Sequence, residues 1–231
     1  MSKICVKRSY PLGNRAIHSL KELCIGSRPR HSGERFLIMD YLKKLLILDL
    51  DETLIYAAEA SFPRKADFLV EPYHIYKRPF LDVFLKKCLD WFEVAVWTSS
   101  TPSYAIAIVS AIFENPKILS FVWASERCTV AYDPEWFEYY NRKNLKKVKR
   151  KGYRLESIIA VDDTPQKWER SYGNRVRVNP FEGDETDDEL KYLLLYLDKL
   201  RSAENIRSVE KRFWQNQLIR SIGESGISNA Q

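Results

Sequence analysis

Two aspartates at the end of an apolar segment offer the clearest chemistry in the sequence. Asp49 and Asp51 stand in LLILDLDETL, with Thr53 two residues further on. Carboxylates this close can divide the work of phosphate transfer, because one can attack phosphorus while the other protonates the leaving oxygen and later activates water. Both would face a phosphate dianion as anions, so the site needs a cation, and Mg²⁺ prefers the oxygen ligands that carboxylates supply.

Three further groups could complete that chemistry. Asp162 and Asp163 follow another apolar run, and together with Asp49 they could hold Mg²⁺. The segment 97–100, Trp-Thr-Ser-Ser, offers hydroxyl and backbone N–H groups that can bind phosphate oxygens. Residues 142–151 include seven Lys or Arg, and one lysine among them could balance the charge of the phosphoryl group during its transfer.

These groups need a common scaffold to bring them together. Apolar runs predict buried strands at residues 45–48, 92–97, 118–123, 158–161 and, more weakly, 176–178. Helical patterns occur at residues 81–91, 102–113, 137–151 and 187–201. This alternation predicts an α/β fold with a doubly wound, mostly parallel sheet. Ligands of such sheets bind beyond the carboxyl ends of the strands, which is where both acidic pairs are expected.

The rest of the chain is divided by composition. Residues 66–78 are consistent with a small β-hairpin, too short to form a separate lid domain. We expect a basic arm over residues 1–40, one catalytic domain over 41–201, and a C-terminal helix and tail over 202–231. Thr101-Pro102 and Thr164-Pro165 each predict an N-cap followed by proline in the first helical turn.

The net charge and the cysteines indicate the class of binding partner and the cellular compartment. A net charge of +6 and a pI near 9.0 weakly favour acidic partners, either phosphorylated segments or nucleic acid. The four cysteines are scattered without a CxxC pair, which is typical of reduced thiols. We see neither a secretory signal nor a run of 18 apolar residues, and therefore expect a soluble intracellular protein with no membrane partner. We expect it in the cytoplasm, with the nucleus left open; the oligomeric state is not indicated.

In order, the motifs DLDET, WTSS, a lysine and VDD resemble those of the haloacid dehalogenase superfamily of phosphatases. The chain is most similar to the small C-terminal-domain phosphatase branch, the NIF-type phosphatases. YKRP at 76–79, ERC at 126–128 and KNL at 143–145 add to the similarity, which covers about residues 45–200. The resemblance implies a Rossmann-like core without a large cap domain and an aspartyl-phosphate mechanism.

The resemblance also implies roles for individual residues. Asp49 is expected as the nucleophile and Asp51 as the general acid and base. The predicted catalytic set also includes Thr98 and Lys143. The substrate-binding residues implied are Thr53, Thr98, Ser99 and Lys143. The implied Mg²⁺ ligands are Asp49, the backbone carbonyl of Asp51, and Asp162 or Asp163.

Two departures from the family pattern leave alternatives open. Relatives commonly have Asp-Asn where this chain has Asp162-Asp163, so either acid could bind the metal. The spacing from KNL to that pair is also longer than in the family. Lys146 or Lys147 could therefore take the place of Lys143.

Three functions compete at this point. The first is a phosphatase acting on phosphoserine or phosphothreonine in a phosphoprotein or phosphopeptide, because the short insert at 66–78 leaves the site open to a polypeptide. The second is a phosphatase of the same superfamily for small molecules or nucleic acid, since only access to the site would differ. The third is a non-catalytic module that docks phosphoproteins, against which the intact set of acids argues, because a scaffold gains nothing from clustered unpaired charges.

Overall fold

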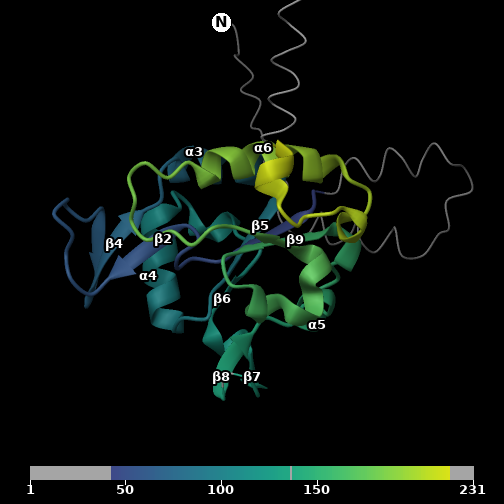
Figure 1. Cartoon of the computed structure of the whole chain (residues 1–231), viewed down its shortest axis with the longest axis horizontal. Helices are drawn as coiled ribbons and strands as arrows, with labels where there is room; N and C mark the ends of the chain where they lie inside the picture. The colour runs from purple at the N-terminus through teal and green to yellow at the C-terminus, as the bar shows by residue number, and fades with distance from the viewer. Residues whose placement is uncertain (1–42, 136, 219–231) are drawn as a thin grey trace, which may run out of the picture. The chain divides into compact units, whose positions relative to one another are not determined.

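The computed structural model describes residues 43–135 and 137–218, and a five-stranded parallel sheet lies at their centre (Figure 1). Its strands are β1 (Leu45–Leu48), β5 (Glu93–Trp97), β6 (Val122–Trp123), β9 (Ile158–Asp162) and β10 (Arg175–Arg177). The order across the sheet is β10-β9-β1-β5-β6, and every neighbouring pair is parallel. β1 is therefore the central strand, paired with β5 and β9.

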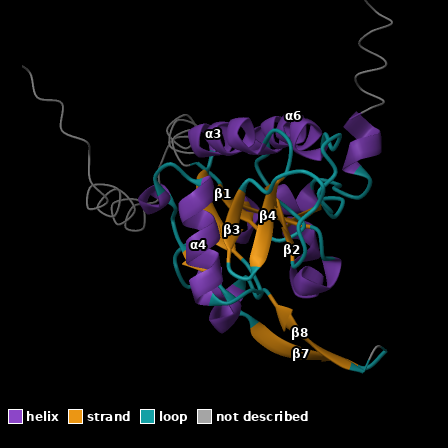
Figure 2. Ribbon diagram, turned by 90° about the vertical axis from the view of Figure 1, so that its left-hand side faces the viewer, coloured by secondary structure: helices purple, strands orange, loops and turns teal. Residues whose placement is uncertain are grey.

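Both faces of the sheet are covered, as the continuous apolar run of β1 predicts. Leu46 and Leu48 belong to a core shared with the helices α3 (Leu81–Trp91), α4 (Pro102–Ile112) and α6 (Glu189–Ser202). Leu45 and Ile47 belong to a second core, which includes side chains from α5 (Lys146–Lys149) and the 3₁₀ segment η4 (Pro165–Asn174). Figure 2 shows α3 and α6 side by side over the strands. The predicted doubly wound α/β fold is confirmed.

The two predicted helix starts differ in detail. Thr101 caps α4 by accepting a hydrogen bond from the backbone N–H of Tyr104 at 3.4 Å, and Pro102 lies in the first turn. Pro165 likewise opens η4, but Thr164 makes no side-chain cap there. Its hydroxyl donates instead to Asp163 at 2.9 Å, so the second Thr-Pro pair serves the acidic cluster rather than the helix end.

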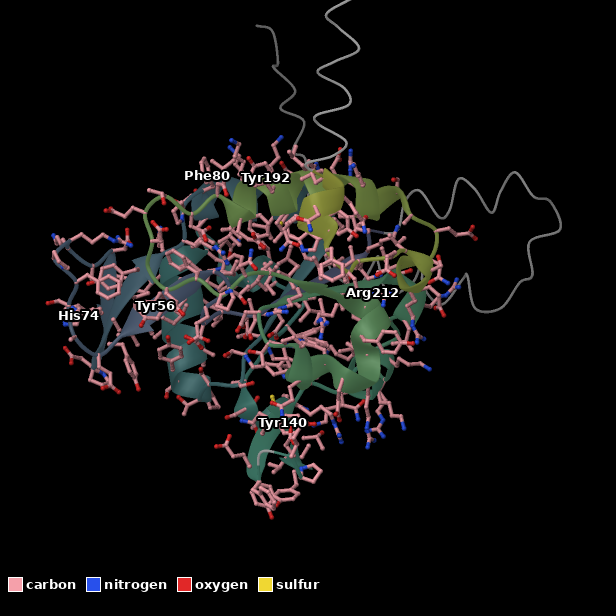
Figure 3. The ribbon with its side chains drawn as sticks, viewed as in Figure 1. Tyr56, His74, Phe80, Tyr140, Tyr192 and Arg212 are labelled. Atoms are coloured by element: carbon pink, nitrogen blue, oxygen red, sulfur yellow. The ribbon has the colours of Figure 1, made fainter. Side chains whose placement is uncertain are left out.

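The predicted hairpin at 66–78 is part of a three-stranded antiparallel sheet. It consists of β2 (Ile55–Ala58), β3 (Phe68–Val70) and β4 (Tyr73–Lys77) in the order β2-β4-β3. β2 begins four residues after Asp51, so the small sheet grows directly out of the acidic loop. Tyr56 and His74 mark this sheet at one side of the molecule (Figure 3).

The predicted helix at 137–151 is wrong for most of its length. The first part of this range is the strand β8 (Glu138–Arg142), which pairs in an antiparallel hairpin with β7 (Thr129–Asp133). The 3₁₀ turn η2 (Ser125–Arg127) lies just before β7. Aromatic cross-strand contact outweighs the helical spacing of the basic residues here, since Tyr132 faces Tyr139 with ring centroids 5.1 Å apart. Only α5 is helical. The hairpin projects away from α3 and α6 (Figures 1 and 2), and Tyr140 lies on it in Figure 3.

Two other expected elements are shorter than predicted. The expected strand at 118–123 is reduced to β6, because Pro116–Ile118 form a 3₁₀ turn. The expected C-terminal helix is interrupted after α6 by the 3₁₀ turn η5 (Ile206–Ser208), and helix resumes at Trp214. The proposed arm at 1–40 and the end of the tail lie outside the described residues. Within the described ranges, no helix combines the length and apolar character needed to cross a bilayer.

Candidate active site

Three neighbouring strands deliver their polar residues to one edge of the sheet. Asp49 follows β1 directly, Thr98 follows β5, and Asp162 is the last residue of β9. The N–H of Asp49 donates to the carbonyl of Val161 at 3.0 Å, and the N–H of Thr98 donates to the carbonyl of Trp123 at 2.9 Å. Parallel strands thus bring residues far apart in sequence to a common carboxyl edge, where ligands of open α/β sheets bind.

Asp49 is a buried carboxylate held by two lysines. Its Oδ1 accepts the N–H of Leu50 at 2.9 Å. Its Oδ2 lies 2.8 Å from Lys143 Nζ and 2.9 Å from Lys167 Nζ. Burial alone would raise the pKa of Asp49, but the charges of Lys143 and Lys167 outweigh burial and hold that pKa below its usual range. The group is therefore an oriented anion, which is the form that can attack phosphorus.

Among the three lysines that the sequence left open, the contacts to the acids belong to Lys143. Its ammonium is fully buried between Asp49 and Asp162, 2.6 Å from Asp162 Oδ2. Lys146 is exposed. Lys147 donates to the backbone carbonyls of Arg127 and Cys128, at 2.7 and 3.0 Å. The part of the chain that the structure describes thus offers Lys143 for the charge-balancing role.

Asp162 and Asp163 have different surroundings. Asp162 Oδ2 accepts both Lys143 Nζ and the indole N–H of Trp168, the latter at 2.7 Å. Burial and the negative charge of Asp49 raise the pKa of Asp162 to about 6. Asp163 instead accepts hydroxyl groups, from Thr53 at 3.4 Å and from Thr164 at 2.9 Å.

The acid cluster fits a hard divalent cation. Asp49, Asp162 and Asp163 are all buried, and each offers a carboxylate oxygen within 4.8 Å of the others. Such a set is the oxygen donor group that Mg²⁺ prefers, and buried carboxylates in contact require positive charge to offset their repulsion. The residues present therefore match the predicted cofactor.

The carboxylate of Asp51 is held by three hydroxyl groups. Tyr104 donates to Asp51 Oδ1 at 2.6 Å, while Ser100 and Thr98 approach Oδ2 at 2.7 and 3.4 Å. Burial and the nearby charge of Asp51 raise the pKa of Tyr104, so this phenol stays protonated and remains a donor. Hydroxyl groups therefore orient this second carboxylate, whereas ammonium groups orient Asp49.

The chain matches the family model described as NIF, NLI interacting factor-like phosphatase, over residues 44–207. It belongs to this family. CTD small phosphatase-like protein 2 of Dictyostelium discoideum is 30% identical over 184 residues, covering 75% of this chain and 30% of that protein. CTD nuclear envelope phosphatase 1 homolog of Drosophila melanogaster is 29% identical over 185 residues, covering 74% of this chain and 72% of that protein.

Other relatives are longer or more distant. The matched regions span only 48% of Phosphatase Herzog of Drosophila melanogaster and 30% of the Dictyostelium relative, so the chain spans about half or less of those two proteins. The solved structure of Fcp1, an essential RNA polymerase II CTD phosphatase, superposes with a TM-score of 0.49 at 19% identity, covering 75% of this chain and 53% of that chain.

Among the described residues of this NIF-type chain, four side chains contact the acids although the sequence analysis assigned them no role in the site: Tyr104, Thr164, Lys167 and Trp168. A signal existed for Tyr104, since it lies in the first turn of α4, which begins four residues after Thr98. The predicted Ser99 offers its backbone carbonyl to Asn141 at 3.5 Å, while the hydroxyl that reaches Asp51 is that of Ser100.

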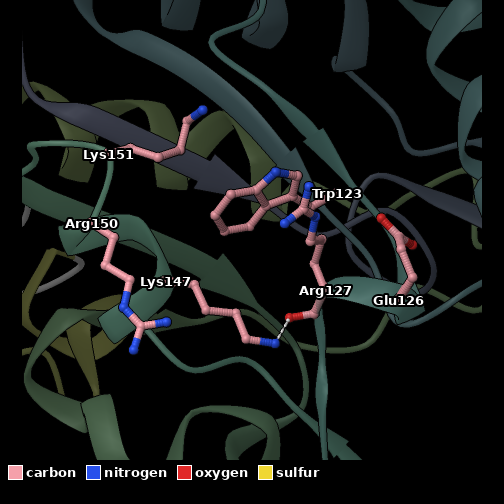
Figure 4. A pocket seen from close by; sticks show the side chains of 6 residues that line it. All are labelled: Trp123, Glu126, Arg127, Lys147, Arg150 and Lys151. Carbon is pink, nitrogen blue, oxygen red and sulfur yellow. Dashed lines mark hydrogen bonds between the residues drawn. The ribbon is translucent and has the colours of Figure 1, made fainter.

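A basic cavity of about 350 Å³ lies at the carboxyl end of β6 (Figure 4). It is lined by Trp123, Glu126, Arg127, Lys147, Arg150 and Lys151. Two connections tie it to the site: the N–H of Ser125 donates to the carbonyl of Ser100 at 2.9 Å, and α5 begins three residues after Lys143. Four cations and one carboxylate surround the cavity, so it favours an anionic group.

Proposed function

We propose that the chain is a Mg²⁺-dependent phosphatase that hydrolyses phosphomonoesters through an aspartyl-phosphate on Asp49. The observation that carries the proposal is the pairing of two unlike carboxylates at one strand end. Asp49 is buried against two ammonium groups, whereas Asp51 is held by hydroxyls. Such a division suits one group to attack and the other to move a proton.

The reaction follows in two steps from these positions. A carboxylate oxygen of Asp49 attacks phosphorus, the ester P–O bond breaks, and Asp51 gives a proton to the leaving oxygen. Water then attacks the phosphorus of the aspartyl-phosphate, Asp51 takes a proton from it, and the bond to Asp49 breaks to release phosphate. Lys143 stays beside Asp49 throughout and offsets the charge of the phosphoryl group.

We assign the metal to Asp49, the backbone carbonyl of Asp51, and Asp163. Asp163 is the better candidate of the acidic pair, because Asp162 Oδ2 is already occupied by Lys143 and Trp168. A bound Mg²⁺ would polarise the phosphoryl oxygens and offset their negative charge. Thr98 and Thr53 contribute by contacts to Asp51 and Asp163, beside the place where those oxygens must lie.

Phosphoserine or phosphothreonine in a polypeptide is the substrate we infer. Within the described residues, the insertions into the core are two small antiparallel sheets rather than a closing domain, so a chain segment can reach Asp49. The basic cavity next to the site suits acidic or phosphorylated neighbours of the target residue. The names of the relatives, which include CTD phosphatases, point to the same substrate class.

The proposal includes an intracellular location. Within the described ranges, Cys88 and Cys128 are free thiols, which is consistent with a reducing compartment. One relative is named for the nuclear envelope, which brings the nucleus into consideration for this chain.

The deciding experiment measures hydrolysis of para-nitrophenyl phosphate with and without Mg²⁺. Asp49→Asn should lower the Mg²⁺-dependent rate by at least about 1000-fold, because the amide cannot act as the nucleophile. Asp90→Asn, at an exposed position of α3, is the matched control and should keep the rate. Equal rates in wild type and Asp49→Asn would refute the mechanism. A folded but inactive wild type, tested also with phosphopeptides, sugar phosphates and 3′-phosphorylated oligonucleotides, would favour a docking module.

A further inference from the structure

The ammonium group of Lys167 lies among the same three carboxylates that fit a metal ion. Lys167 Nζ is 2.9 Å from Asp49 Oδ2, 3.7 Å from Asp162 Oδ1 and 4.0 Å from Asp163 Oδ1. These aspartates form the acid cluster that fits a divalent ion, and two of them, Asp49 and Asp163, are the proposed Mg²⁺ ligands. A lysine therefore already supplies positive charge where the divalent ion would do so.

Lys167 differs from Lys143 in its freedom to leave. The Lys143 side chain is 0% exposed and its ammonium also lies 5.6 Å from the centre of the Trp168 ring, so it is enclosed. The Lys167 side chain is 19% exposed, which places it at the mouth of the cluster. Its backbone is held, because its carbonyl accepts the N–H of Lys143 at 2.8 Å. Movement of Lys167 would thus be confined to a flexible side chain with a path to solvent.

The charges in the cluster favour either the ammonium group of Lys167 or a Mg²⁺ ion in this position, but not both together. Three carboxylates and the fixed Lys143 leave a net charge of −2, which one Mg²⁺ would cancel. With Lys167 also in place the net charge of the cluster is −1. A divalent ion would then meet an ammonium group at contact distance. That repulsion is strong at short range in a partly buried site. Asp49 Oδ2 cannot serve a close Lys167 and a metal ion equally well.

We propose that Lys167 is a resident counter-cation of the metal site: it stabilises the metal-free protein, competes with the divalent ion for Asp49, and withdraws to the mouth when the ion binds. From the mouth the ammonium group can meet an oxygen of the incoming phosphoryl group. This inference rests on the proposed function for the identity of the ion. It makes Lys167 a positioning residue whose effect is measurable without substrate.

The test measures Mg²⁺ binding to the full chain by titration calorimetry, together with thermal melting in metal-free and Mg²⁺-containing buffer. Lys167→Met should bind Mg²⁺ at least about tenfold more tightly, because a competing charge is gone. The same variant should melt at a lower temperature without metal and show a larger rise in Tm on adding Mg²⁺. Lys167→Arg keeps the charge and should bind like wild type. Lys146→Met, at an exposed position, should change neither quantity.

Lys167→Gln provides a second neutral variant if the methionine variant does not fold without metal, and it should show the same tightening. Unchanged or weaker Mg²⁺ binding in a folded neutral variant would overturn the inference. If wild type binds Mg²⁺ and Asp49→Asn abolishes turnover, that result would leave the proposed function intact. If neither wild type nor the variants bind Mg²⁺, both the inference and the metal requirement of the proposed function fail.

Discussion

Arg78 and Asp187 form a two-pronged ion pair behind the loop that carries the acidic motif. Arg78 Nε donates to Asp187 Oδ1 at 2.8 Å and Nη2 donates to Oδ2 at 2.7 Å. Arg78 is fully buried, and its Nη1 donates to the backbone carbonyl of Thr53 at 3.1 Å. Because Thr53 in turn contacts Asp163, the ion pair supports the site from outside it.

We therefore predict that Asp187→Ala lowers the free energy of unfolding by about 3 kcal/mol, since it leaves a buried guanidinium without its partner. Denaturant titration measures the change. Asp188→Ala is the matched control: this neighbour is exposed, makes no side-chain cap bond, and should cost less than about 0.5 kcal/mol. Similar small losses in both variants would show that the pair contributes little.

Tyr104→Phe tests the hydroxyl support of Asp51. The substitution removes the donor 2.6 Å from Asp51 Oδ1 and keeps the ring. A hydrogen bond to a charged group is worth about 1.5 to 3 kcal/mol, so we expect kcat to fall about 10- to 100-fold with little change in KM. Tyr73→Phe is the control, since its ring packs edge-on against Tyr104 at 6.0 Å. Equal kcat values in wild type and Tyr104→Phe would remove Tyr104 from the mechanism.

Changing Asp162 or Asp163 to alanine should have different effects, one on the stability of the protein and the other on its Mg²⁺ dependence. Asp163→Ala should raise the Mg²⁺ concentration for half-maximal activity by about tenfold or more, because a charged oxygen ligand is lost. Asp162→Ala should lower stability by about 2 kcal/mol, because Lys143 and Trp168 lose a buried acceptor. Metal titrations and denaturant titrations on both variants give the comparison. The reverse pattern would assign the metal to Asp162.

The core strands and the acidic pairs were predictable because their signals are local. The run at 45–48 is apolar at every position, and in the structure alternate residues enter opposite cores, so burial on both faces explains the pattern. Asp49 directly follows that run, and the parallel sheet then carries Asp162 next to it. The local sequence was therefore sufficient to predict this part of the site, together with the rule that parallel strands end at one edge of the sheet.

Other features depend on contacts that local patterns do not encode. Lys167 meets Asp49 across 118 positions of sequence, and its neighbourhood shows only a turn after Thr164-Pro165. The helix predicted at 137–151 is wrong over β8, because the basic residues that follow this strand have helical spacing. A local signal was present in Asp133-Pro134, since Asp133 Oδ1 accepts the N–H of Glu135 at 2.9 Å in the connecting turn.

The basic cavity beside the site should strengthen the binding of peptide substrates and have little effect on small ones. Arg150 and Lys151 are exposed residues lining it, on the side opposite Glu126 in Figure 4. Changing both to serine should raise KM for a phosphopeptide with acidic flanking residues about fivefold at low salt, because long-range attraction is lost. Turnover of para-nitrophenyl phosphate should change less than about twofold, since that molecule has no flanking acids to bind.

The control for this prediction removes the same charge elsewhere. Lys86 and Lys87 are exposed on α3, whose buried side chains belong to the other core of the sheet. Changing both to serine lowers the net charge equally and should leave KM for the acidic peptide within about twofold of wild type. Rising salt should narrow the difference between the two double variants, because it screens exposed charges. If both pairs weaken peptide binding equally, the overall charge of the protein, and not the cavity, attracts the substrate.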